Sequence, residues 1–170
     1  DAIARMPGMA GQDADARSAY TQVPVEGEGS IGQQYGHVHT WVTIPHHQRP
    51  KEWNSIDDPV VLLLRNLYGH PRAGFYWEKF AHAAVIDAGF EKVPGWECLY
   101  VHREKQLFLS IYVDDFKMAG KAENIQPMWD KLNATLTLDP PTELHENVYL
   151  GCSQHLFEPP KDMVDSQSEF

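Results

Sequence analysis

The stretch LFLSIYVDDFKMAG, residues 107–120, sets two adjacent carboxylates directly after a run of strand-forming residues. Alternate residues of a strand face opposite sides of a sheet. One side is aliphatic: Leu107, Leu109, Ile111 and Val113. The other side is mixed: Phe108, Ser110, Tyr112 and Asp114. The pattern predicts that the first side packs against helices and that the second lines an exposed groove, with Asp114 and Asp115 in the turn at its end.

Flanking segments extend this strand into an antiparallel unit. CLYVH (98–102) precedes it, and the polar REKQ (103–106) separates the two, which predicts a hairpin. FKMAG (116–120) predicts a short strand that returns from the acidic pair. The unit therefore contains three neighbouring strands.

Two other segments have the spacing of amphipathic helices. The first begins near Pro71, which fits a first helical turn, and ends at Gly89. Its apolar face comprises Trp77, Phe80, Ala81, Ala84, Val85 and Ala88. The apolar face of the second comprises Ile125, Trp129, Leu132 and Leu136, with Pro127 expected in its first turn. Both tryptophans on these faces are expected to be packing residues.

The rest of the chain completes an α+β pattern. Residues 40–45 and 146–153 predict strands, and residues 60–69 predict a strand or the entry to a helix. Residues 1–12 are expected to be loose, 23–39 and 46–59 to be loops, and 155–170 to be a disordered tail. We therefore expect one domain over residues 13–154, an antiparallel sheet with helices packed on one face.

Composition narrows the class of protein. The 170 residues suffice for one domain, and the net charge of −10 is unusual for a free-standing nucleic-acid binder. No apolar run approaches the ~18 residues of a membrane helix, and no secretory signal is evident. We expect an intracellular protein with Cys98 and Cys152 reduced. The first residue is Asp rather than Met, which indicates a piece of a longer product.

The acidic pair alone has two interpretations. Asp is common in turns, and Asp57 with Asp58 is interpreted as a solvated turn. Two adjacent like charges raise one pKa, and a divalent cation removes that repulsion. The tetrad YVDD at a hairpin tip, after an alternating apolar strand, is a more specific signal than an Asp pair by itself.

YVDD resembles the signature of reverse transcriptases. Five stretches resemble the Ty1/copia retrotransposon class, in the order of that family: DADARSAY (13–20), LRNLYGHPRAGFYWEKF (64–80), GFEKVPGWECLYVH (89–102), LFLSIYVDDFKMAG (107–120) and VYLGCSQ (148–154). The resemblance spans most of the chain and implies a palm subdomain of an RNA-directed DNA polymerase. It also implies a site for two Mg²⁺ ions, with Mn²⁺ as a substitute, that transfers nucleotides.

The resemblance assigns roles by motif position. Asp15 corresponds to the first-strand carboxylate, and Asp114 and Asp115 complete the catalytic, metal-binding triad. Asp13 is a neighbouring alternative, but Asp15 sets Ala19 and Tyr20 at the family's offset.

Other residues would contact the substrates. Tyr20 would act as a gate against a 2′-hydroxyl, and Ala16, Arg17 and Ser18 would lie beside the nucleotide triphosphate through their backbone. Tyr112 would touch the primer end, and Arg72 would contact nucleic acid or cap a loop.

The implied partners are an RNA or DNA template–primer, deoxynucleoside triphosphates and the rest of a retrotransposon polyprotein, with no membrane. The implied location is a cytoplasmic virus-like particle or the nucleus. Two departures weigh against activity of this segment alone. His70 alone separates LYG from PRA, where the family has more residues, and nothing corresponds to fingers or thumb. The alternative is therefore a catalytically inactive remnant or an interaction module with the same fold.

Histidines in the first half of the chain raise a separate possibility of zinc. They are His37, His39, His46 and His47. No CxxC motif accompanies them, which favours polar loop histidines over a zinc site.

Overall fold

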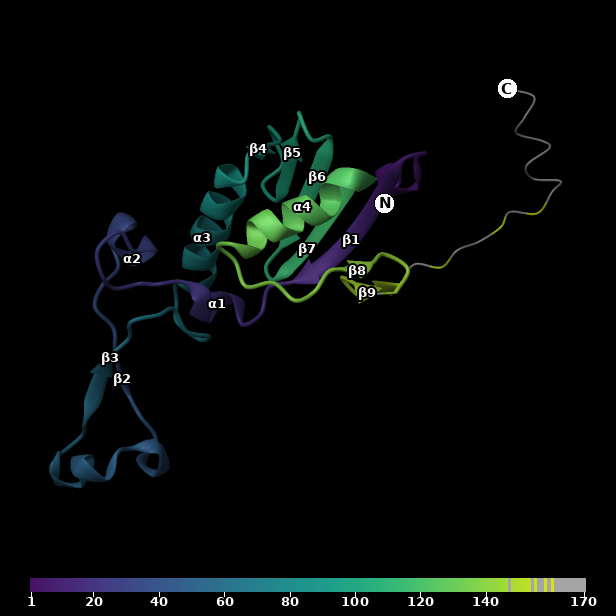
Figure 1. Ribbon diagram of the computed structural model, residues 1–170. Coiled ribbons are helices and arrows are strands. Elements are labelled where there is room, and N and C mark those ends of the chain that lie inside the picture. The colour runs from purple at the N-terminus through teal and green to yellow at the C-terminus, as the bar shows by residue number, and fades with distance from the viewer. Residues whose placement is uncertain (147, 154, 156–157, 159, 161–170) are drawn as a thin grey trace.

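The computed structural model describes residues 1–146, 148–153, 155, 158 and 160, and its main element is a six-stranded antiparallel sheet (Figure 1). The order of the strands is β4 (Glu91–Lys92), β5 (Leu99–His102), β6 (Leu107–Tyr112), β7 (Asp115–Lys121), β1 (Met9–Asp15) and β8 (Thr142–Glu143). This arrangement confirms a mixed fold with an antiparallel sheet, and it confirms the three-stranded unit around residues 107–120.

The two long helices, α3 (Ala73–Asp87) and α4 (Ala122–Asn133), pack on one face of this sheet (Figure 1). His82 on α3 pairs with the Tyr100 hydroxyl at 3.1 Å, and the Trp129 indole on α4 donates to the Gln12 side chain at 3.0 Å. Register puts these two sheet residues in one row of side chains with Leu109 and Met118. Each helix is therefore tied to the same side of the sheet.

Alternation along β6 is as expected. Leu107 and Leu109 are fully buried and Ile111 is 8% exposed, whereas Phe108 and Tyr112 are 36% and 57% exposed. Val113, expected on the buried side, is 45% exposed with φ +56°. It belongs to the turn rather than to the strand, so the alternation stops before it.

Residues 1–12 were expected to be loose, but most of them are ordered. Met9–Asp15 form β1, an inner strand of the sheet, and the short 3₁₀ helix η1 (Ile3–Arg5) lies against β1 and β7. Gly11 permits this contact, because a Cβ there would lie 2.7 Å from the Ala4 Cβ. The pairing with β7 fixes residues that lack any periodic signal of their own.

Two boundaries predicted near the second helix and at the last strand are wrong. Helix α4 begins at Ala122, so Pro127 lies inside it rather than in its first turn. Tertiary packing of Ile125 and Trp129, both nearly inaccessible, compensates for the backbone bond that Pro127 lacks. The segment 146–153 forms two short paired strands, β9 (Val148–Tyr149) and β10 (Cys152–Ser153), because the chain turns at Leu150 and Gly151.

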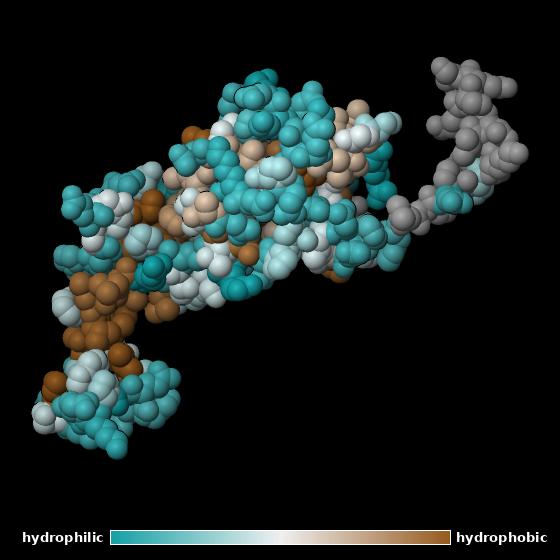
Figure 2. All heavy atoms as spheres, viewed as in Figure 1, coloured by the Kyte–Doolittle hydropathy of each residue, from teal (hydrophilic) through white to brown (hydrophobic). Residues whose placement is uncertain are grey.

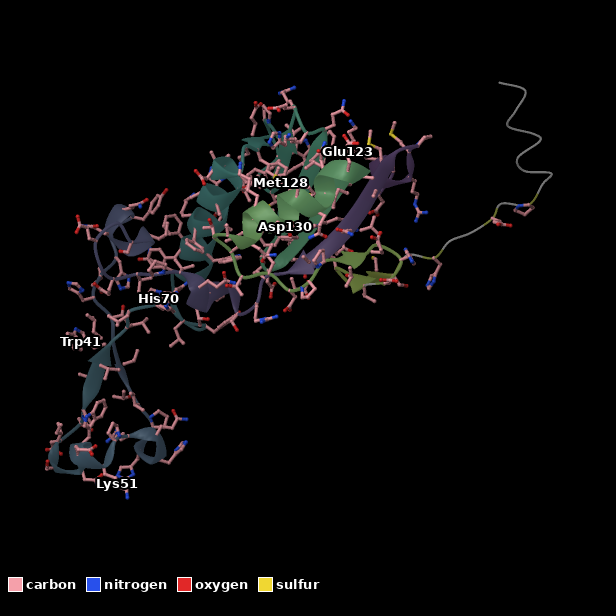
Figure 3. All side chains as sticks on the ribbon, viewed as in Figure 1. Trp41, Lys51, His70, Glu123, Met128 and Asp130 are labelled. Carbon is pink, nitrogen blue, oxygen red and sulfur yellow. The ribbon has the colours of Figure 1, made fainter. Side chains whose placement is uncertain are left out.

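An arm extends from the body between α2 and α3 (Figure 1). Strands β2 (Trp41–Thr43) and β3 (Val60–Leu62) pair in it, with η2 (His46–Gln48) and η3 (Lys51–Ser55) between them. Trp41 and Lys51 mark its two ends in Figure 3. Figure 2 shows an apolar band on the arm between its polar tip and the body. Exposed apolar residues of this segment of the chain include Val38, Val60 and Leu64.

The remaining short helices are α1 (Ala19–Gln22) and α2 (Ile31–Gln34), the second inside a segment expected to be a loop. The two cysteines are free thiols, as expected. Within the described part of the chain, no helix is both long and apolar enough to cross a membrane. The predicted tail lies almost wholly outside the described residues.

The alternation along β6 predicts unequal effects of two neighbouring substitutions. Leu109→Ala removes a fully buried side chain and is expected to lower the free energy of unfolding by about 2–5 kcal/mol. Phe108→Ala, on the exposed side, is the matched control and is expected to lower it by about 1 kcal/mol or less. Urea unfolding measures both, and equal losses would contradict this orientation of β6.

Candidate functional site

The end of β1 and the β6–β7 turn meet at one edge of the sheet. Asp15 lies directly opposite Asp115 in the antiparallel register. The Ala16 amide then donates to the Asp114 carbonyl at 2.7 Å, which ties the end of β1 to the turn. Backbone pairing thus brings together the three acidic residues that the sequence singled out.

The carboxyl groups of Asp15 and Asp115 lie close enough to each other for hydrogen bonding with Asp15 to affect the pKa of Asp115. Burial raises the pKa of the Asp115 carboxyl, and the charges of Asp15 and Asp114 and the bond to Asp15 raise it further. Two carboxylates this close repel each other, and a cation between them would remove that repulsion. Asp15 and Asp114 are exposed and Asp115 is half-buried, which leaves the pair reachable from solvent.

The third carboxylate, Asp114, lies at the tip of the turn and acts on Asp115 through its charge. Among the side chains that the structure describes, no three His, Cys, Asp or Glu are grouped so as to hold a metal ion as they stand. The arrangement is therefore a close pair with a third carboxylate nearby.

Asp13 lies on the same face of β1 as Asp15, two residues further into the sheet. It is 1% exposed, and neither carboxylate oxygen has a hydrogen-bond partner. The Lys117 ammonium lies 3.9 Å from one of these oxygens and 3.0 Å from the Asp1 carboxylate. Burial raises the pKa of Asp13 to about 6; Lys117 opposes this shift, and the charges of Asp115 and Asp15 add to it. Asp13 was the alternative to Asp15 for the first-strand carboxylate. In the structure Asp15 is exposed and Asp13 is buried.

A cavity of about 240 Å³ opens beside the turn, between α3 and the ends of β5 and β6. Its lining includes Tyr20, Trp77, Tyr112 and Val113, and Tyr100 of β5. Tyr20 stacks at a tilt against Tyr68, with ring centroids 4.6 Å apart. The structure therefore brings the two predicted substrate-contacting tyrosines to one cavity, which Val113 of the turn also lines and none of the three aspartates does.

Backbone amides of the predicted triphosphate segment are engaged inside the chain. Ala16 is buried and bonded to Asp114, and the Arg17 amide donates to the Thr137 carbonyl at 2.9 Å. The Arg17 side chain forms an exposed ion pair with Asp139. Ser18 has φ +50° and precedes α1. These contacts hold the segment in one conformation, and they occupy two of the amides predicted for a triphosphate.

Arg72 holds a loop. Its guanidinium donates to the Tyr35 and Gly36 carbonyls at 3.0 Å each and lies 4.8 Å from the Phe75 and Tyr76 ring centroids. Its amide bonds to His70, labelled in Figure 3, at 3.2 Å. The sequence left two roles open for Arg72, contact with nucleic acid and capping of a loop. These contacts are those of a residue that caps a loop.

Histidines expected to be polar loop residues include one that is buried. The His37 side chain is 3% exposed and lies 3.4 Å from the Glu26 carboxylate, which also pairs with His39 at 2.7 Å. Burial lowers the pKa of His37, and Glu26 opposes this shift. His37 also lies 3.2 Å from the Tyr76 hydroxyl, a contact that joins the loop around α2 to α3.

The sequence does not predict the hydrogen bond that Trp77 makes to the acidic turn. Trp77 is 2% exposed, as predicted for a packing residue, but its indole also donates to the Val113 carbonyl at 2.6 Å. The two residues are far apart in sequence, and helical spacing predicts the burial of Trp77 but carries no signal for this bond.

A scan against protein-family models and a search of the curated proteins found no match to this chain. The assignment to reverse transcriptases therefore stays a prediction from motifs, and the geometry above is independent of it.

The pKa of Asp13 predicts how stability depends on pH. In the unfolded chain the carboxyl titrates near 3.8, and in the folded chain near 6, so the folded state binds the proton more tightly. Stability is therefore lost as pH rises from about 4 to about 6, by up to ~3 kcal/mol at ~1.4 kcal/mol per pKa unit. Asp13→Asn removes this titration and is expected to be more stable than wild type above pH 6, with the gain vanishing below pH 4.

Urea unfolding of both proteins between pH 3.5 and 8 measures this difference. Asp139→Asn, at an exposed ion pair, is the control and should show no such crossover. A constant difference between Asp13→Asn and wild type across this range would contradict the assignment.

Proposed function

We propose that this chain is the catalytic-core segment of an RNA-directed DNA polymerase, with the palm fold of the Ty1/copia reverse transcriptases. The observation that carries the proposal is the approach of Asp15 to Asp115 across the β1–β7 pair, with Asp114 in the adjoining turn. Five motifs in family order add support from the sequence. The substrates would be deoxynucleoside triphosphates and a primer paired to an RNA or DNA template.

The donor set fits Mg²⁺ or Mn²⁺. Carboxylate oxygens are the ligands that these cations prefer, and like charges this close favour a cation between them. Asp15 and Asp115 would hold the metal, with Asp114 as a third ligand. Bound there, the ions would lower the pKa of a primer 3′-hydroxyl and offset charge on the triphosphate.

Other residues would position the substrates. Tyr20 and Tyr112 line one cavity together with Val113 of the turn and would contact the incoming sugar and the primer end. The bond from the Ala16 amide to the Asp114 carbonyl would keep the two acidic segments in register. Positioning of this kind supplies a large share of the rate in phosphoryl transfer.

The second candidate is a non-catalytic module with the same fold. Arg17 and Arg72, both predicted near substrate, are engaged with the chain itself. The net charge of −10 also opposes the binding of a polyanion. This candidate predicts a folded chain whose carboxylates do not bind divalent cations.

Calorimetric titration with Mn²⁺ separates the two candidates. The wild-type chain is expected to bind the cation, and Asp15→Asn, Asp114→Asn and Asp115→Asn are each expected to weaken binding at least about tenfold, because each removes one carboxylate from the site. Asp58→Asn is the matched control, since it removes one member of the other adjacent Asp pair, and it should leave binding unchanged.

Primer extension with Mn²⁺ then tests the reaction. Asp115→Asn is expected to reduce extension by about 100-fold or more, the scale of losing one electrostatic group of a catalytic site. Binding unaffected by any of the three substitutions would refute the polymerase site and favour the non-catalytic module.

A further inference from the structure

We propose that Trp77 is a positioning residue for the acidic turn: its indole N–H holds the Val113 carbonyl and so fixes the direction in which Asp114 points. The meaning of that direction for catalysis rests on the proposed function. The claim that Trp77 holds the turn rests on contacts alone, and it can be tested without measuring activity.

The bond joins α3 to the turn across the core. The paired residues of β6 and β7 end at Tyr112 and Asp115, so Val113 and Asp114 lie beyond the ladder. The Val113 carbonyl accepts from the Trp77 indole at 2.6 Å, and the Asp114 carbonyl accepts from the Ala16 amide at 2.7 Å. Two successive carbonyls of the turn are thus held from two different elements, α3 on one side and β1 on the other.

The conformation of Val113 explains why such a hold is needed. Its φ of +56° lies in the region that glycine adopts freely, and a β-branched side chain is strained there. Such a conformation persists only where surrounding contacts over-determine it. The Val113 side chain is 45% exposed, so burial of its own methyl groups contributes little to holding it. The bond from the buried Trp77 remains as the main constraint on its carbonyl.

Loss of this bond would release the turn on one side. Val113 could then relax toward negative φ, and Asp114, the next residue, would change direction relative to Asp15 and Asp115. The Ala16 amide would report the change, because its bond is to the carbonyl of Asp114 itself. Trp77 also forms part of the wall of the cavity that Tyr20 and Tyr112 share, so its packing and its hydrogen bond act at the same place.

The first test compares Trp77→Phe with Trp129→Phe in the full chain. Both substitutions keep an aromatic ring and remove one indole bond from a nearly inaccessible tryptophan, but only the first bond reaches the turn. Amide hydrogen exchange is followed by NMR at Ala16, with Met118 in the middle of β7 as the reference. In Trp77→Phe the protection of Ala16 relative to Met118 is expected to fall at least tenfold, and in Trp129→Phe less than threefold. Equal changes in the two variants would overturn the proposal.

A second pair of variants tests strain directly. Val113→Gly removes the penalty of a positive φ, so adding Trp77→Phe to it should lower the relative protection of Ala16 less than threefold. A tenfold loss in both backgrounds would overturn the proposal.

The wild-type chain offers a measurement that needs no folded variant. The Trp77 indole N–H should exchange at least 100-fold more slowly than that of Trp96, which is 65% exposed, and similar rates would overturn the bond itself.

Mn²⁺ titration connects this inference to the proposed function. Trp77→Phe is expected to weaken Mn²⁺ binding at least threefold although it removes no carboxylate, and Trp129→Phe should not. An unchanged affinity together with lost protection of Ala16 would overturn the link to Asp114. A wild-type chain that binds no Mn²⁺ would refute the polymerase site instead, and the exchange measurements would still decide whether Trp77 holds the turn.

Discussion

The antiparallel pairing of β1 with β7 is the constraint on which the rest of the structure depends. It joins the N-terminal segment to the acidic hairpin and sets Asp15 opposite Asp115. Its register extends to Met9 opposite Lys121, so the position of the acidic pair is fixed by backbone bonds well away from the charges. Gly120 allows β7 to pass close to β6, since a Cβ there would lie 2.1 Å from the Gln106 carbonyl oxygen.

The same pairing gathers like charges on one face. Asp13, Asp15 and Asp115 repel one another, and this repulsion adds to the burial that raises the pKa of Asp13 and of Asp115. The Lys117 ammonium, 3.9 Å from the Asp13 carboxylate, offsets part of it. An apolar residue at Asp13 would be more favourable for folding alone. Carboxylates kept close against their repulsion are a feature of functional sites rather than of packing, and this is the physical reason to regard the edge as a site.

Alternation along strands and glycine at helix ends predicted the parts of the fold that neighbouring residues determine. The alternation of Leu107 and Leu109 with Phe108 gave the correct buried side, and Gly89 gave the end of α3 because its φ of +100° favours glycine. The strand at Met9–Gln12 could not be predicted, because Met, Ala, Gly and Gln form a strand there only by pairing with β7. In the site, too, only the residues marked by a local pattern were predicted. Asp114 and Asp115 were found from their hairpin, whereas the bond from Trp77 to Val113 depends on how α3 lies against the turn.

The distribution of charge around the site bears on how a polymerase of this kind would work. The face that carries Asp15 and Asp115 is acidic, and Arg17 is paired with Asp139 beside it. A phosphate chain that approaches this face meets repulsion until cations occupy it, and exposed repulsion of this kind weakens with salt. If the carboxylates serve as proposed, divalent cations are needed first for the nucleotide to approach and only then for its chemistry. A turn held rigid by α3 and β1 suits this order, because carboxylates fixed in advance bind a cation without first having to be gathered.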